Sequence, residues 1–151
     1  MDRVVISNET GAQVGAVRKP AGYSGTPLVA KLGIKSGARM QVLNPPSDFS
    51  ETLGSLPDAV TPVSRGALDF AMLFATRRTD LAKRFPGLRD RLASNGMLWI
   101  AWPKQRSGAP TDLSENIIRA IGLELGLVDV KVCAVDATWS GLKFVRRLKD
   151  R

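Results

Sequence analysis

The stretch Leu68-Asp69-Phe70-Ala71-Met72-Leu73-Phe74-Ala75 decides the fold class of this chain. Apolar residues occupy consecutive positions in it, which is typical of a strand buried on both faces of a sheet. Residues 97–102, Met-Leu-Trp-Ile-Ala-Trp, form a second such run. Between them, apolar residues recur at helical spacing from Thr79-Asp80 onward; we expect Pro86-Gly87 to divide this helix before it ends at Asn95-Gly96. The order of strand, helix and strand predicts parallel strands joined by a right-handed crossover.

Strands and helices alternate along most of the remaining chain. We expect further strands over 38–43, 60–63, 128–135 and 142–148, and further helices over 27–32, 48–53 and 112–125. The last of these helices begins at a capping-box pattern, Asp112 with Glu115 three residues later. A turn over 136–141 joins the last two strands. The sequence therefore predicts an α/β domain with a mainly parallel sheet and a closing antiparallel hairpin.

One link does not suit a helical crossover. Only about five residues separate the 60–63 strand from the 68–75 strand, fewer than the ~10–12 that such a crossover needs. Either this crossover is a bare loop, or the 60–63 strand, which contains Pro62, is a minor edge strand.

The composition excludes several kinds of chemistry. The chain has 151 residues, no histidine and one cysteine, Cys133. It therefore has no imidazole base, no disulfide within the chain and no multi-thiolate metal site. We expect neither a metal nor a cofactor. Cys133 lies in a valine-rich strand, and we interpret it as a small core residue rather than a nucleophile.

Length, hydropathy and charge set broader expectations. The pattern indicates a single domain over 25–151, preceded by an extended or flexible arm over 1–24 that could bind a protein partner. No apolar run approaches the ~18 residues of a membrane span, so we expect a cytoplasmic protein without membrane association. The net charge of +8 suggests nucleic acid or an anionic ligand as a partner, or simply a soluble basic domain.

The order of elements from Leu68 onward resembles the second half of a class I methyltransferase fold. The run 68–74, the helix after it, the turn at Asn95-Gly96 and the strand 97–100 look like that family's central strand, helix, glycine turn and next strand. The closing hairpin is similar too. The resemblance covers about residues 35–150 and implies a Rossmann-like scaffold.

A second resemblance rests on four motifs. They are Tyr-Ser-Gly-Thr-Pro-Leu at 23–28, Ala-Trp-Pro-Lys at 101–104, Asp-Leu-Ser-Glu at 112–115, and the stretch 130–142. Together they look like a bacterial family of small proteins of unknown function. This resemblance also implies a Rossmann-like fold, and it brings no catalytic residues with it.

The chain departs from the methyltransferase pattern at the cofactor turn. That family has a glycine-rich turn after its first strand, which lets the backbone approach S-adenosylmethionine, whereas this chain has Leu43-Asn44-Pro45-Pro46. The acidic residue expected after the next strand is replaced by Val63-Ser64-Arg65. We therefore do not expect this cofactor to bind in the family's usual mode.

Open parallel sheets bind ligands outside the carboxyl ends of their strands. At these ends the sequence places cationic, aromatic and polar side chains, with one carboxylate at the hairpin turn: Asn44, Arg77, Arg78, Trp102, Lys104, Arg106, Asp136 and Trp139. We expect the helix that begins at Thr79 to add its positive dipole end beside Arg77, which favours an anion. We also expect Trp102 and Trp139 to supply a flat stacking surface.

Three functions are compatible with these residues. The first, which we prefer, is a non-catalytic binding or regulatory module that recognises an anionic small molecule at this edge, or a protein partner. The second is an enzyme of unassigned type that uses Asp136, Lys104 or Arg77. The third is weak, sequence-independent binding of nucleic acid through the arginines and lysines of 77–91 and 146–151.

Overall fold

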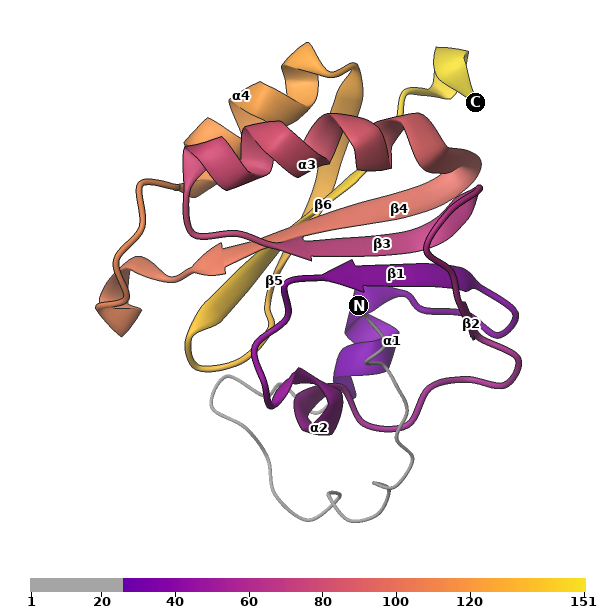
Figure 1. Ribbon diagram of the computed structural model, residues 1–151, viewed down its shortest axis with the longest axis horizontal. Helices are drawn as coiled ribbons and strands as arrows, with labels where there is room; N and C mark the ends of the chain where they lie inside the picture. Colours follow the sequence, from indigo (N-terminus) through magenta and orange to yellow (C-terminus); the bar gives the residue numbers. More distant parts are fainter. Residues whose placement is uncertain (1–25) are drawn as a thin grey trace.

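The computed structural model describes residues 26–151, so the predicted N-terminal arm lies outside the described residues (Figure 1). This part of the chain forms one six-stranded sheet with the strand order β2-β1-β3-β4-β6-β5. Its strands are β1 (Arg39–Leu43), β2 (Thr61–Pro62), β3 (Leu68–Phe74), β4 (Leu92–Pro103), β5 (Leu127–Ala134) and β6 (Trp139–Arg146). The first four are parallel, whereas β6 runs antiparallel to both β4 and β5. This confirms the predicted fold class: a mainly parallel α/β sheet with a closing antiparallel hairpin.

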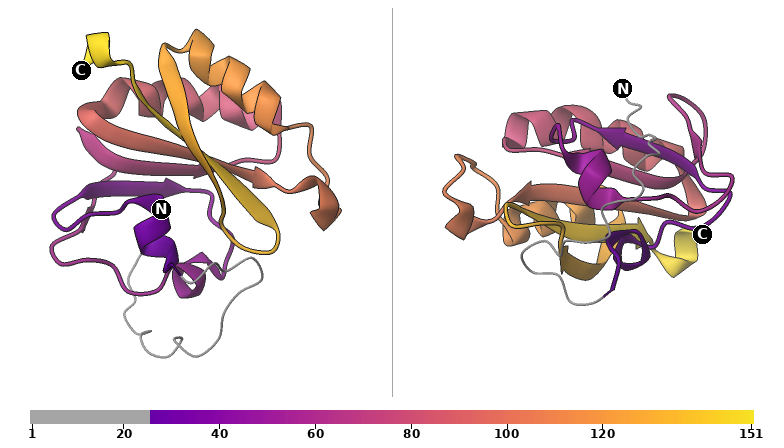
Figure 2. Two further views of the ribbon diagram at one scale, coloured as in Figure 1. Left: turned by 180° about the vertical axis from the view of Figure 1, so that it is seen from behind. Right: turned by 90° about the horizontal axis from the view of Figure 1, so that it is seen from below.

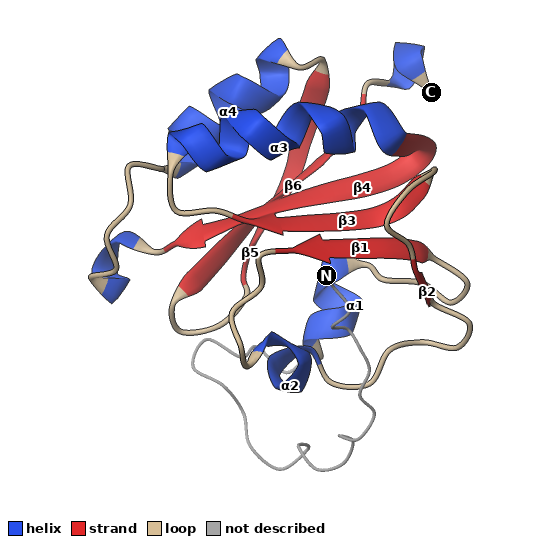
Figure 3. Ribbon diagram, viewed as in Figure 1, coloured by secondary structure: helices blue, strands red, loops and turns tan. Residues whose placement is uncertain are grey.

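Helices cover both faces of the sheet. The longer ones, α3 (Arg78–Arg91) and α4 (Glu115–Glu124), lie on one face, and the short helices α1 (Leu28–Leu32) and α2 (Phe49–Leu53) lie on the other (Figures 2 and 3). Two single turns of 3₁₀ helix, η2 (Gln105–Ser107) and η3 (Leu148–Asp150), complete the secondary structure of residues 26–151.

β3 is buried on both faces from Phe70 onward, as the apolar run that follows Asp69 predicts. Phe70, Met72 and Phe74 pack with α1 and α2, while Ala71 and Leu73 pack with α3 and α4. Successive side chains of a strand point to opposite faces, so one short strand contributes to two separate cores.

The structure corrects the expected end of the helix after β3. α3 runs through Pro86 without a break, and β4 begins directly after it at Leu92, so Asn95 and Gly96 lie within the strand. Leu92 pairs with Leu68, after which the register shifts before regular pairing resumes. A Cβ atom on Gly96 would lie 2.7 Å from the Leu68 carbonyl oxygen. The glycine therefore permits a close approach between strands rather than ending the helix.

The expected capping box at the start of α4 is wrong. The N-cap of this helix is Ser114, whose Oγ accepts the Ile117 amide at 3.3 Å. The Asp112 carboxylate instead accepts the Arg78 amide at 2.8 Å, at the first residue of α3. Glu115 forms an ion pair with Arg119, one turn along α4. Asp112 therefore caps a different helix from the one its sequence position suggests.

Both explanations offered for the short link before β3 hold. β2 is a two-residue edge strand that pairs only with Arg39 and Met40, and the five residues from Val63 to Ala67 form a loop without a helix. Because Pro62 lies beside the beginning of β1, the chain is already at the end of the sheet where β3 starts. No long crossover is needed.

Acid should weaken the junction of β1 and β3 through Asp69. Its carboxylate accepts hydrogen bonds from Arg39 Nε and Nη2, both at 2.8 Å, and from the Arg39 amide at 2.9 Å. The side-chain hydrogen bond from Arg39 is the main cause that lowers the pKa of Asp69 to about 2. Since the pKa is lower in the folded state, the stabilisation is present above about pH 4 and is lost as the pH falls toward 2.

Urea unfolding between pH 6 and pH 2.5 checks this expectation. Asp69→Asn should be less stable than the wild type at pH 6 and should lose less stability on acidification. Asp58→Asn, at an exposed carboxyl group, is the matched control and should follow the wild-type profile. Parallel profiles for Asp69→Asn and the wild type would contradict the assignment.

A second prediction concerns the packing of α4 on the sheet. A Cβ atom on Gly122 would lie 2.1 Å from Cε1 of Phe144, whose ring is fully buried. We expect Gly122→Ala to destabilise the protein by about 1–3 kcal/mol, because overpacking outweighs the gain in helix propensity. In contrast, Gly87 in α3 has open space around it, so Gly87→Ala should stabilise by about 0.5–1 kcal/mol. Chemical denaturation measures both, and shifts of the same sign would refute the packing argument.

Candidate functional site

The carboxyl ends of β1, β3 and β4 lie along one edge of the sheet, together with the turn between β5 and β6 (Figure 1). Asn44 directly follows β1; it is exposed and has a left-handed backbone, with φ 56°. Arg77 and Arg78 follow β3 and are exposed at the start of α3. Lys104 follows β4 and precedes η2. The structure therefore places all four of these residues at the edge that the sequence predicts.

Lys104 and Arg106 share a shallow, open hollow at this edge. The Lys104 amide donates to the Thr138 carbonyl at 2.7 Å, which holds the end of β4 against the hairpin turn. The hollow has a volume of about 440 Å³ and is lined by Lys104, Gln105, Arg106 and Ser140. Asn44, Arg77 and Arg78 are not among its lining residues, so the structure brings together only part of the predicted group.

Sequence reasoning missed Gln105 and Ser140. The signal for Gln105 was its position between two cations of the predicted site. Ser140 was assigned to the hairpin turn, but β6 begins one residue earlier, at Trp139, and Ser140 pairs with Trp102 of β4.

The expected stacking surface of two tryptophans is wrong. In the β4–β6 ladder Trp102 lies opposite Ser140, and Pro103 lies opposite Trp139. The two tryptophans are therefore one register position apart and point to opposite faces of the sheet. Trp102 is buried under α3 and α4. Trp139 packs on the other face, where its ring lies edge to face with that of Phe74 and the two ring centroids are 5.1 Å apart.

The Asp136 carboxylate accepts hydrogen bonds from two backbone amides of its own turn. Its Oδ1 accepts the amides of Thr138 and Trp139, both at 2.8 Å, and so closes the turn between β5 and β6. This arrangement is the usual way in which an aspartate stabilises a tight turn. It leaves less capacity for the acid–base role that the sequence allowed.

The expected anion at the start of α3 is in part supplied by the protein itself. The Arg78 amide, which belongs to the first turn of α3, is capped by the Asp112 carboxylate. Thr111 also holds the loop that carries Asp112. Its Oγ1 donates to the Thr76 carbonyl at 2.6 Å and accepts the Leu113 amide at 3.0 Å. The dipole of α3 therefore already faces a negative charge.

Cys133 lies in the core, as predicted. It is buried among the residues packed with α1 and α2. Burial raises the pKa of its thiol, against a smaller opposite effect of Lys31 and Lys131. A neutral, buried thiol suits packing rather than nucleophilic chemistry.

The cofactor turn of the methyltransferase pattern does not fit S-adenosylmethionine here. The turn after β1 contains Pro45 and Pro46, which have no amide hydrogen, and no glycine whose missing side chain would let a ligand approach the backbone. β2, the next strand, ends at Pro62 and is followed by Arg65 instead of an acidic residue for the ribose. The residues at the family's cofactor position therefore lack both recognition elements.

Comparisons with known proteins bear on the scaffold. No protein-family profile and no curated protein sequence matches the chain. Among solved structures, it is similar to a ribosomal protein L11 methylase from Lactobacillus delbrueckii subsp. bulgaricus, with 12% identity and a TM-score of 0.53 over 80% of this chain and 75% of the other. It is also similar to magnesium protoporphyrin IX methyltransferase from Synechocystis PCC 6803 with bound SAM, with 13% identity and a TM-score of 0.51 over 80% of this chain and 74% of the other.

Another structure of the latter enzyme, with bound SAH, aligns with only 52% of its own length. At these identities the likeness concerns the fold. The chain thus has a methyltransferase-like, Rossmann-like scaffold, consistent with the resemblance seen in the sequence.

Among the helices of residues 26–151, none combines the length and the apolar character that a membrane span requires.

Substitution of Asp136 tests its role in forming the turn between β5 and β6. Asp136→Ala removes the acceptor of two amides and should lower the free energy of unfolding by about 1 kcal/mol. Asp136→Asn keeps an acceptor oxygen and should unfold close to the wild type. Thermal unfolding at neutral pH measures both variants. Equal destabilisation of the two would show that the charge, rather than the acceptor, is what the turn requires.

Proposed function

We propose that this protein is a non-catalytic binding or regulatory module that recognises an anionic small molecule at the hollow beside Lys104. The observation that carries the proposal is an imbalance of charge at this edge. Lys104 and Arg106 line the hollow, whereas the carboxylates of the neighbouring loops, Asp112 and Asp136, lie outside its lining and each accept backbone amides through Oδ1. The lining thus contains two cations and no carboxylate, which favours binding of an anion over acid–base catalysis.

The geometry of the lining supports this proposal. Lysine supplies a compact charge and arginine a planar group of donors, so the pair suits phosphate or carboxylate. Gln105 and Ser140 add neutral donors and acceptors. Arg77 and Arg78 lie at the same sheet edge, where their charge would attract an anion without lining the hollow.

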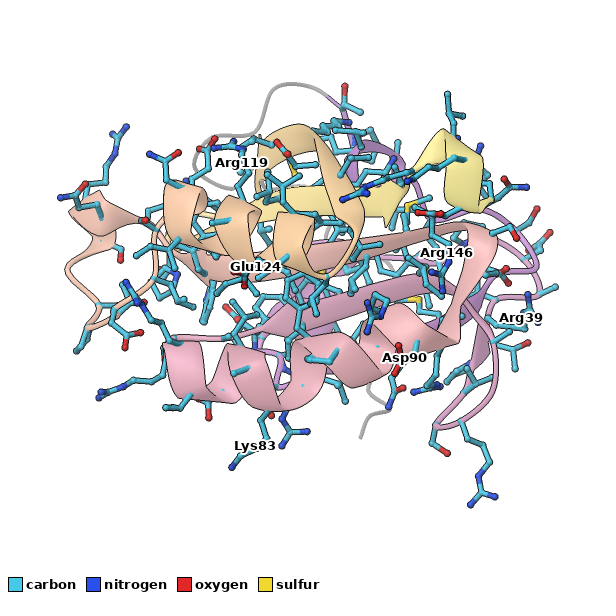
Figure 4. All side chains as sticks on the ribbon, turned by 90° about the horizontal axis from the view of Figure 1, so that it is seen from above. Arg39, Lys83, Asp90, Arg119, Glu124 and Arg146 are labelled. Carbon is cyan, nitrogen blue, oxygen red and sulfur yellow. The ribbon has the colours of Figure 1, made fainter. Side chains whose placement is uncertain are left out.

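Nucleic-acid binding through α3 and the C-terminal arginines has less support. Arg146 Nη2 donates to the carbonyls of Arg89 and Leu92 at 2.8 and 2.7 Å, and Arg91 Nε donates to the Gly66 carbonyl at 2.9 Å. Arg146 thus fastens the junction of α3 and β4 (Figure 4), and Arg91 ties the end of α3 to the loop before β3. Their charges serve the fold, which reduces the cationic surface available for phosphates.

Thermal unfolding of the full chain with added ligands tests the proposal. The probes are inorganic phosphate, AMP, citrate and S-adenosylmethionine. A phosphate or carboxylate probe should raise the unfolding temperature, and at 100 times its Kd it should add about 2.7 kcal/mol of stability. Lys104→Gln/Arg106→Gln should abolish this increase. Lys83→Gln/Arg84→Gln, which removes the same charge from two exposed residues of α3, should retain it (Lys83 is labelled in Figure 4).

Other results would overturn the proposal. If only S-adenosylmethionine stabilises the protein, the enzyme alternative on this methyltransferase-like scaffold gains support. If no probe stabilises it, the hollow is not an anion site. If the control variant loses the effect equally, the probes respond to net charge rather than to this site.

A further inference from the structure

Four lysines from three parts of the chain lie at the sheet face that carries α1 and α2. Lys131 of β5 and Lys143 of β6 are direct partners in the antiparallel ladder. Lys31 belongs to the last turn of α1, and Lys35 follows that helix. We call these four residues the lysine cluster. It lies at the middle of the β5–β6 hairpin, away from the Lys104 hollow at the hairpin's turn.

Contacts link three lysines of the cluster to the end of α1 and to β5. Lys131 Nζ donates to the Lys31 carbonyl at 2.9 Å, and Lys31 Nζ donates to the Ala134 carbonyl at 3.2 Å. A Cβ atom built on Gly33, the C-cap of α1, would lie 3.8 Å from Lys143 Nζ. The ammonium groups of Lys131 and Lys143 therefore lie at the end of α1, whereas that of Lys31 is held at the end of β5.

The direct pairing of Lys131 with Lys143 is unfavourable, and the carbonyls at the end of α1 offset only part of the repulsion. Like charges directly opposite each other in an antiparallel pair destabilise a sheet. No ion pair within residues 26–151 involves any lysine of the cluster; the ion pairs found there are made by arginines. Burial, together with the charges of Lys131 and Lys35, lowers the pKa of Lys143.

Helix capping explains only part of the cluster. Lys131 satisfies a terminal carbonyl of α1, and the neighbouring Leu32 carbonyl is satisfied by Trp99 Nε1 at 2.9 Å. The side chain of Lys143 makes no hydrogen bond within the described part of the chain, yet it is half-buried beside Lys131. A packing role alone would be met by an uncharged side chain at this position.

We propose that the lysine cluster is a second anion site, which binds an oligophosphate group such as a pyrophosphate. A multiply charged ligand is required to balance several ammonium groups, and lysine binds phosphate as a compact point charge with three donors. The group could belong to free pyrophosphate or to a nucleoside diphosphate. The site does not depend on the Lys104 hollow.

Titration of the full, ¹⁵N-labelled chain with pyrophosphate, and separately with ADP, tests this site. Pyrophosphate should shift the amide signals of Gly33, Lys131 and Lys143 in a saturable manner. Lys143→Gln should weaken its binding by about tenfold, as expected for loss of one charge contact. The same variant, without any anion, should unfold at a temperature equal to or above that of the wild type, because repulsion is relieved.

Two controls keep the outcome specific. Lys83→Gln, on the opposite side of the sheet, should leave the pyrophosphate affinity unchanged (Figure 4). Lys104→Gln/Arg106→Gln should also leave it unchanged, so that failure of one proposed site is distinguishable from failure of the other. Tighter binding of ADP than of pyrophosphate would identify a nucleotide as the source of the group, and equal or weaker binding would identify the oligophosphate itself.

The proposal is overturned if pyrophosphate causes no saturable shift at these amides. It is also overturned if Lys143→Gln binds pyrophosphate as the wild type does. A lower unfolding temperature for Lys143→Gln in the absence of anion would show that this lysine stabilises the fold, so that its charge needs no ligand to explain it. Lys131→Gln then provides a second measurement at the same site, and unchanged pyrophosphate affinity in that variant would also overturn the proposal.

Discussion

Burial of β3 on both faces is the constraint on which the rest of the structure depends. Its side chains alternate between two cores, so the sheet needs cover on either side. α3 and α4 are long enough to supply this cover on one face. On the other face α1 and α2 have only five residues each, too few for stable helices in isolation. They persist because the apolar face of the sheet holds them, with Trp99 bonded to the end of α1.

The sequence predicted most elements because their signals are local. Apolar runs, helical spacing and the breaks at Gly33 and Asn44-Pro45-Pro46 were sufficient to locate β3, α1 and β1. Two local rules failed where tertiary contacts outweighed them. Pro86 lies inside α3, since the burial of Phe85 and Leu88 on either side of it holds the helix against the sheet. Likewise, Asp112 caps a helix distant in sequence, which no local pattern reveals.

The candidate site was only partly predictable for a related reason. Strand ends fix which edge a residue occupies, and the cations Lys104 and Arg106 were located in this way. The face to which a side chain points depends on register, and a shift of one residue reverses it. That is why Trp102 and Trp139 were wrongly expected to stack together. The lysine cluster was not predicted at all, because the pairing of Lys131 with Lys143 depends on the register of β5 and β6.

The loop from Lys104 to Leu113 is anchored at both ends. At one end the Lys104 amide is bonded to the hairpin turn, and at the other Thr111 and Asp112 are bonded to the residues around Thr76 and Arg78. A loop held in this way has lost most of its conformational freedom before any ligand arrives. The entropic cost of ordering it is thus borne by folding rather than by binding, so even a shallow hollow with two cations can use its contacts for affinity.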